Sequence, residues 1–259
     1  MRLLMIGDIV GRPGRRAVKD NLPELVSRYG IDIVIANGEN AAGGNGITRD
    51  LARELFSYGV DVITMGNHVW NQKEIMSYID KEDRIIRPAN YPPGTPGSGS
   101  GVFRAGNGVE IGVINISGRV FMQELDCPFR KGDEMVKLLK ERVGIIFIDF
   151  HAEASSEKVA MGWYMDGRVA AVCGTHTHVQ TADERVLPGG TAYISDVGMT
   201  GPADSVIGVK KELVIEKFIT QMPRRFEVAD GLYQFNAVLV EVDENSTRAL
   251  GIQRIQNFE

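Results

Sequence analysis

The sequence predicts an α/β fold in which two mixed sheets pack face to face with helices outside, a four-layer α/β/β/α sandwich. Three observations predict this class. Short apolar runs alternate with helical segments in both halves of the chain, and hairpin signals interrupt that alternation. The 259 residues, 43% of them hydrophobic, are enough for one large core, so we expect a single domain over residues 1–259.

The first third of the chain has the pattern of a repeated strand and helix unit. The expected strands are 3–6, 31–36 and 60–65, and the expected helices are 13–30, 49–58 and 71–78. Pro13 suits a first helical turn, Thr48 is a favoured helix cap, and Gly30 and Gly59 end their helices. Asn71, with Glu74 three residues later, resembles a capping box.

Antiparallel pairing enters in the middle of the chain. The segments 102–105 and 109–116 flank Gly106-Asn107-Gly108, which predicts a hairpin. Two irregular stretches lie on either side of it. One is 88–101, rich in Pro, Gly and Ser; the other is 118–132, whose apolar side chains indicate a flap or a contact between copies of the chain. We expect both to border the functional cleft.

Alternation resumes in the second half. The expected strands are 144–150, 169–173 and 191–195 with a terminal hairpin of 233–242 and 247–254, and the expected helices are 133–142, 155–167 and 210–221. Ser155 or Ser156 is the expected cap of the second of these helices. Residues 196–208 follow a strand without an assigned element.

Composition excludes several classes of function. The net charge is −5 and both signs are interspersed, so no basic stripe is present for a long nucleic acid. No signal peptide or membrane-spanning run is recognisable, and we expect a cytoplasmic protein with no membrane partner. Cys127 and Cys173 lack metal or redox spacing, and Cys173, at a strand end, is expected to be a buried, inert thiol.

All four histidines of the chain follow predicted strands. They are His68, His151, His176 and His178. Open α/β sheets place their ligands beyond such strand ends. A single histidine there is more often a hydrogen-bonded structural residue, but four of them, with Asp8 and Glu39 also after strands, favour a metal site.

The residue types match what two neighbouring ions need. Ions roughly 3.5–4 Å apart are held by a bridging carboxylate with carboxylate, amide and imidazole ligands. The candidate ligands are Asp8, Glu39, Asn40, Asn67, His151, His176 and His178. Taken singly, Asp8 also suits a turn and Asn67 a helix cap, and the His-Thr-His pair occurs in many zinc enzymes and some structural sites.

These residues carry a family resemblance. Asp8, Gly38-Glu39-Asn40, Gly66-Asn67-His68, His151 and the segment 174–178 resemble, in this order, the five blocks of calcineurin-like binuclear metallophosphoesterases. The similarity extends from Met1 to the C-terminus and is greatest to the bacterial YmdB-like subgroup, described as 2′,3′-cyclic-nucleotide phosphodiesterases. Two positions depart from the general pattern, which has His where Val10 stands and Asp where Glu39 stands.

The resemblance implies a calcineurin-like phosphoesterase fold and a binuclear centre. Asp8, Glu39, Asn40 and His178 would hold one ion, and Glu39, Asn67, His151 and His176 the other. A hydroxide between the ions would attack phosphorus in a cyclic nucleotide, and His68 would protonate the leaving oxygen. The oxygen-rich first set suits iron or manganese, with zinc as a further option.

Three alternatives compete with this interpretation. A metal-dependent amidohydrolase also uses a His-x-His pair, but places it early, on the first strand of a barrel. A non-catalytic regulator with a structural metal would have no use for a spare His68. Nucleotide binding through Gly7, Gly11 and Gly14 lacks the required spacing.

Overall fold

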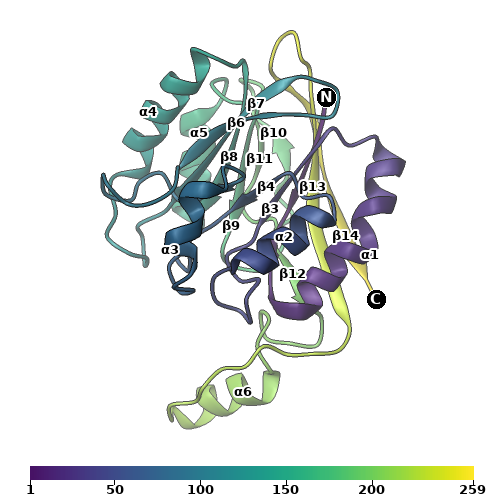
Figure 1. The fold of residues 1–259 in the computed structure, drawn as a ribbon, viewed down its shortest axis with the longest axis vertical. Coiled ribbons are helices and arrows are strands. Elements are labelled where there is room, and N and C mark those ends of the chain that lie inside the picture. The colour runs from purple at the N-terminus through teal and green to yellow at the C-terminus, as the bar shows by residue number, and fades with distance from the viewer.

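The computed structural model describes residues 1–259 as two mixed sheets covered by helices (Figure 1). The strands of the eight-stranded sheet are β1 (Arg2–Ile6), β2 (Asp8–Ile9), β3 (Ile33–Asn37), β4 (Val62–Thr64), β5 (Ile85–Ile86), β12 (Met199–Pro202), β13 (Tyr233–Val242) and β14 (Ala249–Phe258). Those of the six-stranded sheet are β6 (Ser100–Arg104), β7 (Glu110–Ser117), β8 (Ile145–His151), β9 (Ala171–Thr175), β10 (Arg185–Val186) and β11 (Ala192–Ile194).

Both sheets combine parallel and antiparallel pairs. In the first, β1, β3, β4 and β5 are parallel neighbours, whereas β13 runs antiparallel to β1, β12 and β14. In the second, β7, β8, β9 and β11 are parallel, and β6 and β10 add antiparallel edges. The parallel strands therefore bring several carboxyl ends to one edge of each sheet.

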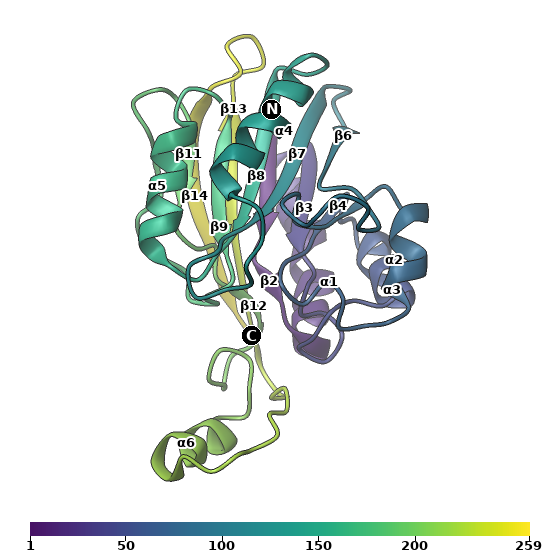
Figure 2. The same ribbon diagram turned by 90° about the vertical axis from the view of Figure 1, so that its left-hand side faces the viewer.

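The helices cover the two outer faces. They are α1 (Gly11–Tyr29), α2 (Arg49–Ser57), α3 (Ile75–Tyr78) followed by a 3₁₀ turn (Ile79–Lys81), α4 (Pro128–Lys140), α5 (Ser155–Met165) and α6 (Lys211–Thr220). Helices α1 and α2 pack on the eight-stranded sheet and α4 and α5 on the six-stranded one (Figure 2). The predicted four-layer sandwich is confirmed.

Three apolar clusters fill the spaces between the four layers, and β1 shows how its sequence serves two of them. Leu4 and Ile6 pack in the cluster under α1 and α2, while Leu3 and Met5 pack between the sheets. Because successive strand residues face opposite sides, a strand buried on both faces must be apolar throughout. That requirement explains the continuous apolar runs from which the strands were predicted.

Several local predictions are confirmed. The Thr48 side chain accepts a hydrogen bond from the Leu51 N–H at the start of α2, and Gly30 caps α1 in the left-handed conformation. The Gly106-Asn107-Gly108 hairpin joins β6 and β7, and β13 and β14 form the terminal hairpin. Cys173 is fully buried, and burial raises the pKa of its thiol.

Other local predictions are wrong. Asn71 and Glu74 form no capping box, because Glu74 accepts from the Arg49 N–H and the Asn71 amide contacts His68. Neither Ser155 nor Ser156 caps α5, which starts after Ala154 with no side-chain cap. Residues 196–208 contain β12, which pairs with β2, so the expected gap is part of the eight-stranded sheet.

The structure also argues against two of the alternative functions, the amidohydrolase and nucleotide binding through glycines. The histidine pair follows β9 of an open sheet, so the barrel expected of an amidohydrolase is absent. Gly7 and Gly14 serve packing: a Cβ would lie 1.9 Å from the Gly198 carbonyl oxygen at Gly7 and 2.3 Å from that of Thr200 at Gly14. Among the helices, none has the length and apolar character needed to cross a membrane.

Helix α6 differs from the rest of the fold. It projects beyond the strand ends, away from both sheets (Figures 1 and 2), and Val214 is its only buried residue. Its base is held by a narrow stem, in which Val209 bridges Val206 and Val228 and the Lys210 N–H donates to the Glu227 carbonyl. The 206–228 segment, including this stem, is called the projection below.

Candidate metal centre

The predicted site residues come together where strands of the two sheets end. Asp8 begins β2, while Glu39 and Asn40 follow β3 and Asn67 and His68 follow β4, all in the eight-stranded sheet. From the six-stranded sheet come the last residue of β8 and two residues after β9, namely His151, His176 and His178. The site thus forms at the junction of both sheets, as the strand-end pattern predicted.

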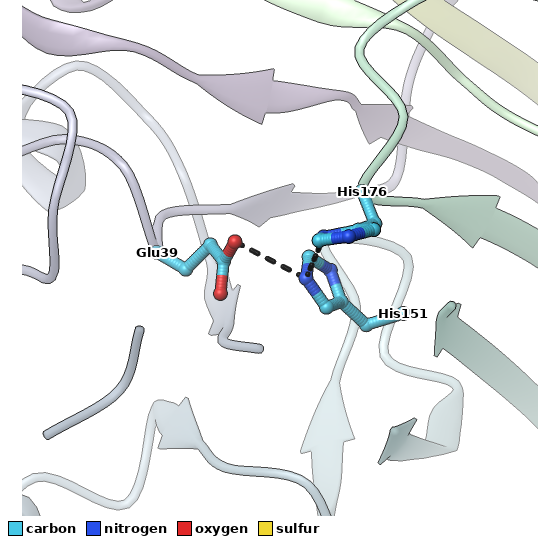
Figure 3. Close-up of side chains that lie close together, drawn as sticks. All are labelled: Glu39, His151 and His176. Atoms are coloured by element: carbon cyan, nitrogen blue, oxygen red, sulfur yellow. Dashed lines mark hydrogen bonds and ion pairs between the residues drawn. The ribbon is translucent and has the colours of Figure 1, made fainter. Parts of the chain in front are cut away.

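Three polar atoms converge on one nitrogen of His151. Its Nε2 atom lies 3.0 Å from Asn67 Oδ1, 3.1 Å from Glu39 Oε1 and 3.1 Å from His176 Nδ1. Figure 3 shows Glu39 and His176 directed at this ring, and these three residues form a cluster with metal-binding spacing. Gly66 leaves room for it, since a Cβ there would lie 2.3 Å from both Glu39 Oε2 and His151 Nε2.

A second set of donors adjoins the first through Glu39. Asn40 Nδ2 lies 3.2 Å from Glu39 Oε1 and 3.3 Å from His178 Nε2, and Asp8 Oδ1 lies 3.9 Å from the same His178 atom. Asp8 Oδ1 is buried and has no hydrogen-bond partner. Burying a carboxylate oxygen without a partner carries a free-energy penalty, and a cation beside it would remove that penalty. Asn40 would present its oxygen after a half-turn of its amide group.

His68 lies beside this cluster and outside it. Its backbone N–H donates to Glu39 Oε2 at 3.0 Å, and its ring Nδ1 lies 2.9 Å from Asn71 Nδ2. The ring is partly exposed and lines the adjoining cavity. His68 is therefore held beside Glu39 by its backbone while its side chain lines the cavity.

A buried network orients His151. Its Nδ1 atom lies 2.9 Å from Thr175 Oγ1, which donates to Asp149 Oδ1 at 2.7 Å. The other Asp149 oxygen accepts from the Thr64 hydroxyl at 2.5 Å and the Asn37 amide at 3.1 Å. Such a network fixes which ring nitrogen faces the cluster and limits rotation of the ring.

The turn that carries the histidine pair is held by hydrogen bonds to Asp196. His176 and His178 both adopt positive φ, 103° and 67°. Between them, the Thr177 N–H and hydroxyl donate to Asp196 Oδ2, which also accepts from the buried Lys158 ammonium at 2.5 Å. These hydrogen bonds offset an unusual backbone conformation.

Each histidine of the pair also has a partner on its outer nitrogen. His178 Nδ1 lies 2.9 Å from the Ile207 carbonyl oxygen, which requires that nitrogen to carry the proton and leaves Nε2 free as a ligand atom. His176 Nε2 lies 3.1 Å from Glu153 Oε2, with the same consequence for its Nδ1. Contacts of this kind are typical of metal-binding histidines.

Burial and mutual charge interactions shift the pKa values of the ionisable groups in this cluster. Burial raises the pKa of Asp8 to about 6. Burial also acts against charge on Glu39 and His151, but their mutual attraction outweighs it, lowering the pKa of Glu39 to about 2 and raising that of His151 to about 9. Burial, with the His151 charge, lowers the pKa of His176 to about 3. Glu39 and His151 thus stabilise each other's charged form.

A cavity of about 570 Å³ opens from the cluster. Glu39, Asn40, His68, His176 and His178 line it, and the projection supplies most of its apolar lining. The prediction that 88–101 and 118–132 border the cleft is wrong for this cavity, because neither contributes a lining residue. Both pack instead around the Asn90 amide, which donates to the Ser117 and Asp126 carbonyls.

Sequence reasoning missed three kinds of residue. Asp149 was detectable as the single charge inside the apolar run of β8, and Thr175 only as a neighbour of the histidine pair. Glu153 and Asp196 have no sequence signal, because they meet the histidines through tertiary contacts. Of the projection, only a helix over 210–221 was predicted, and its place beside the site was not.

The chain is similar to known proteins over nearly its whole length. The chain is 52% identical over 255 residues to the 2′,3′-cyclic-nucleotide 2′-phosphodiesterase of Bacillus subtilis strain 168, covering 98% of this chain and 96% of that protein. A crystal structure of a hypothetical protein from Thermus thermophilus superposes with a TM-score of 0.93 at 43% identity, over 100% of both chains. A crystal structure of a phosphatase from Mycoplasma pneumoniae gives a TM-score of 0.94 at 37% identity, covering 100% of this chain and 94% of that one.

The family itself is recognised across almost the whole sequence. The profile of the YmdB-like proteins matches residues 4–255, a range that includes every candidate ligand and the projection. Together with the Glu39, His151 and His176 cluster, the family implies dependence on a divalent metal. The chain belongs to the YmdB-like protein family.

Proposed function

We propose that the chain is a metal-dependent phosphodiesterase that hydrolyses 2′,3′-cyclic nucleotides such as 2′,3′-cAMP. The observation that carries the proposal is the convergence of Glu39, Asn67 and His176 on His151 Nε2, at 3.0–3.1 Å. One imidazole nitrogen bears at most one hydrogen and cannot satisfy three polar neighbours, whereas a cation can. The relative from B. subtilis, 52% identical, is named for this activity.

We propose that the donor set would hold two transition-metal ions, with Glu39 as a ligand of both. The proposed ligands of the first ion are Asp8, Glu39, Asn40 and His178, and those of the second are Glu39, Asn67, His151 and His176. The unpaired Asp8 oxygen supports the first site and the crowded His151 nitrogen supports the second. The oxygen-rich first set favours iron or manganese, with zinc as the third choice. Such ions, when bound, neutralise phosphate oxygens and lower the pKa of water.

His68 is the proposed general acid. Its ring lines the cavity and is absent from the cluster of Glu39, His151 and His176. The ring, in its protonated form, can give a proton to the departing ribose oxygen. Opening a cyclic diester leaves that oxygen attached to the product, so one positioned acid suffices.

The test combines metal analysis with a substrate panel. Protein reconstituted with manganese, iron or zinc should bind about two equivalents per chain and hydrolyse 2′,3′-cAMP. The panel also includes 3′,5′-cAMP and an N-acyl amino acid, the second of which reports amidohydrolase activity. Saturation by a single ion would contradict the binuclear site, and turnover of the amide alone would contradict the phosphodiesterase. No turnover with two ions bound would favour a non-catalytic regulator.

A further inference from the structure

We infer that the projection is a nucleobase platform, which binds the base of the substrate by stacking. The inference rests on the proposed function, since it assigns the part of a cyclic nucleotide that the metal ligands leave unbound. Its starting observation is that the cavity has two chemically different walls. Strand ends supply carboxylates, an amide and imidazoles, whereas the projection supplies mostly valine, isoleucine and phenylalanine.

One face of α6 is turned to the cavity. Val214, Lys217 and Phe218 line it, and Val214 precedes the other two by three and four residues, which places the three on one side of the helix. Gln221, the residue that caps α6, lines the cavity as well. Phe226, beyond the helix, lines the same wall. Phe218 is 74% exposed and Phe226 is 43% exposed, so both rings are open to a planar ligand. Exposed aromatic rings on a cavity wall are the groups on which nucleobases stack.

Two exposed apolar residues of α6 lie outside the cavity and can be compared with Phe218. Ile215 and Ile219 are also exposed, at 51% and 77%, yet neither lines the cavity. Exposure of apolar side chains is therefore general on this helix, and the orientation of Phe218 distinguishes it from Ile219. This pair allows the platform to be tested against a neighbour of similar exposure.

The chemistry of the wall fits an anionic, base-bearing ligand. Lys217 is the only lysine or arginine lining the cavity, and its Nζ atom lies 4.7 Å from the centre of the Phe226 ring. The ammonium group thus braces that ring and adds positive potential for a phosphodiester. Gln221 is the only amide on this wall, and its Nε2 donates to the Phe218 carbonyl. Aromatic rings stack on the face of any base, so the four bases should be used with similar efficiency.

A hydrogen bond connects the stem of the projection to a residue of the candidate metal centre. The Ile207 carbonyl, in the stem of the projection, accepts from His178 Nδ1 at 2.9 Å. The stem therefore has a fixed position relative to a proposed ligand, and the rings that follow it in sequence stand at a defined side of the cavity. A base can then occupy the apolar wall while its cyclic phosphate faces the strand ends.

The experiment compares two substrates and three variants in metal-loaded protein. The substrates are 2′,3′-cAMP and ribose 2,3-cyclic phosphate, which lacks the base; the variants are Phe218→Ala, Phe226→Ala and the control Ile219→Ala. Each phenylalanine variant should raise KM for 2′,3′-cAMP by about tenfold or more, with little change in kcat and no change on the abasic substrate. The control should match wild type on both.

Binding of 3′-AMP and of ribose 3-phosphate, measured by calorimetry, separates the two proposals. If wild type hydrolyses neither substrate but Phe218→Ala weakens 3′-AMP alone, the proposed function fails and the platform stands. If wild type is active and the phenylalanine variants affect both substrates equally, or affect neither, the platform is wrong and the phosphodiesterase stands. An equal effect of Ile219→Ala would likewise overturn the platform.

Discussion

The cluster at the strand ends and the projection border the same cavity, but they are built in opposite ways. Asp8, Glu39 and His151 are almost completely buried, and each lies in a strand or within two residues of the end of one. In the projection, Val214 is the only buried residue of α6, and the stem is its main attachment. Chemistry that depends on fractions of an ångström sits on the rigid part. Contacts that only need a flat apolar surface sit on the exposed part.

The two regions also differ in how they affect the free energy of folding. Burying Asp8 with an unpaired oxygen, and Lys158 with Asp196, is unfavourable without compensation from partners or a cation. Exposed side chains on α6 carry no such penalty, but they stabilise the fold little. Substitutions in the first region should therefore change metal binding and catalysis together, whereas those in the second should change substrate binding alone.

The largest effect is expected at Glu39. Glu39→Gln keeps the size of the side chain but removes the charge that balances His151 and that is proposed to serve both ions. Metal content should fall at both sites, and kcat should fall by roughly 10⁴-fold or more, because several kcal/mol of charge stabilisation is lost. Elemental analysis and steady-state rates measure this. Loss of only one equivalent of metal would show that Glu39 does not bridge.

His68→Ala should reduce turnover without changing the metal site. Loss of a positioned proton donor lowers kcat by roughly 10² to 10⁴ for a poor leaving group such as a ribose oxygen. A p-nitrophenyl phosphodiester needs little protonation, so the variant should be close to wild type on that substrate. Metal content should remain at the wild-type level. Equal losses on both substrates, or a missing ion, would refute the role given to His68.

Asp149→Asn tests the network behind His151. The substitution keeps the size of the side chain but removes its charge and replaces one of its two acceptor oxygens with a donor. The contacts with Thr175 on one oxygen and with Thr64 on the other can then no longer both be kept, so the orientation of the His151 ring is loosened. Loss of such a supporting contact typically weakens metal affinity by about 10- to 100-fold. Thr64→Val, which removes only a second contact to the same carboxylate, is the milder control. Metal titration followed by calorimetry would give both affinities, and unchanged affinity in Asp149→Asn would leave the network a purely structural role.

The contrast between the regions also explains how far the sequence could predict them. Asp8, Glu39 and His151 could be found because strand ends of an open sheet converge, so order along the chain implies proximity in space. The same reasoning predicted both sheets, since buried strands must be apolar on both faces. It failed where short segments pair only through tertiary contacts, as β2 does with β12.

The projection was beyond prediction for a related reason. The helical pattern of α6 is visible in the sequence, but its direction is set by the stem, whose Val206, Val209 and Val228 give no pairing signal. Apolar residues at helical spacing in a sequence ordinarily indicate the face of a helix that packs on the core. Here that rule misleads, because the stripe at Val214 and Phe218 faces a cavity.

Excision of the outer part of the projection should have the smallest effect on the chemistry. Residues 211–226 can be replaced by Gly-Gly, because the Lys210 N–H and the Glu227 carbonyl already lie 2.9 Å apart. The Ile207 contact to His178 remains in the stem, so metal content should stay at the wild-type level. The melting temperature should change by no more than about 3 °C, since little apolar area is buried there. Turnover of ribose 2,3-cyclic phosphate should persist while KM for 2′,3′-cAMP rises. If metal is lost instead, the two regions form one structural unit and the division drawn between them is wrong.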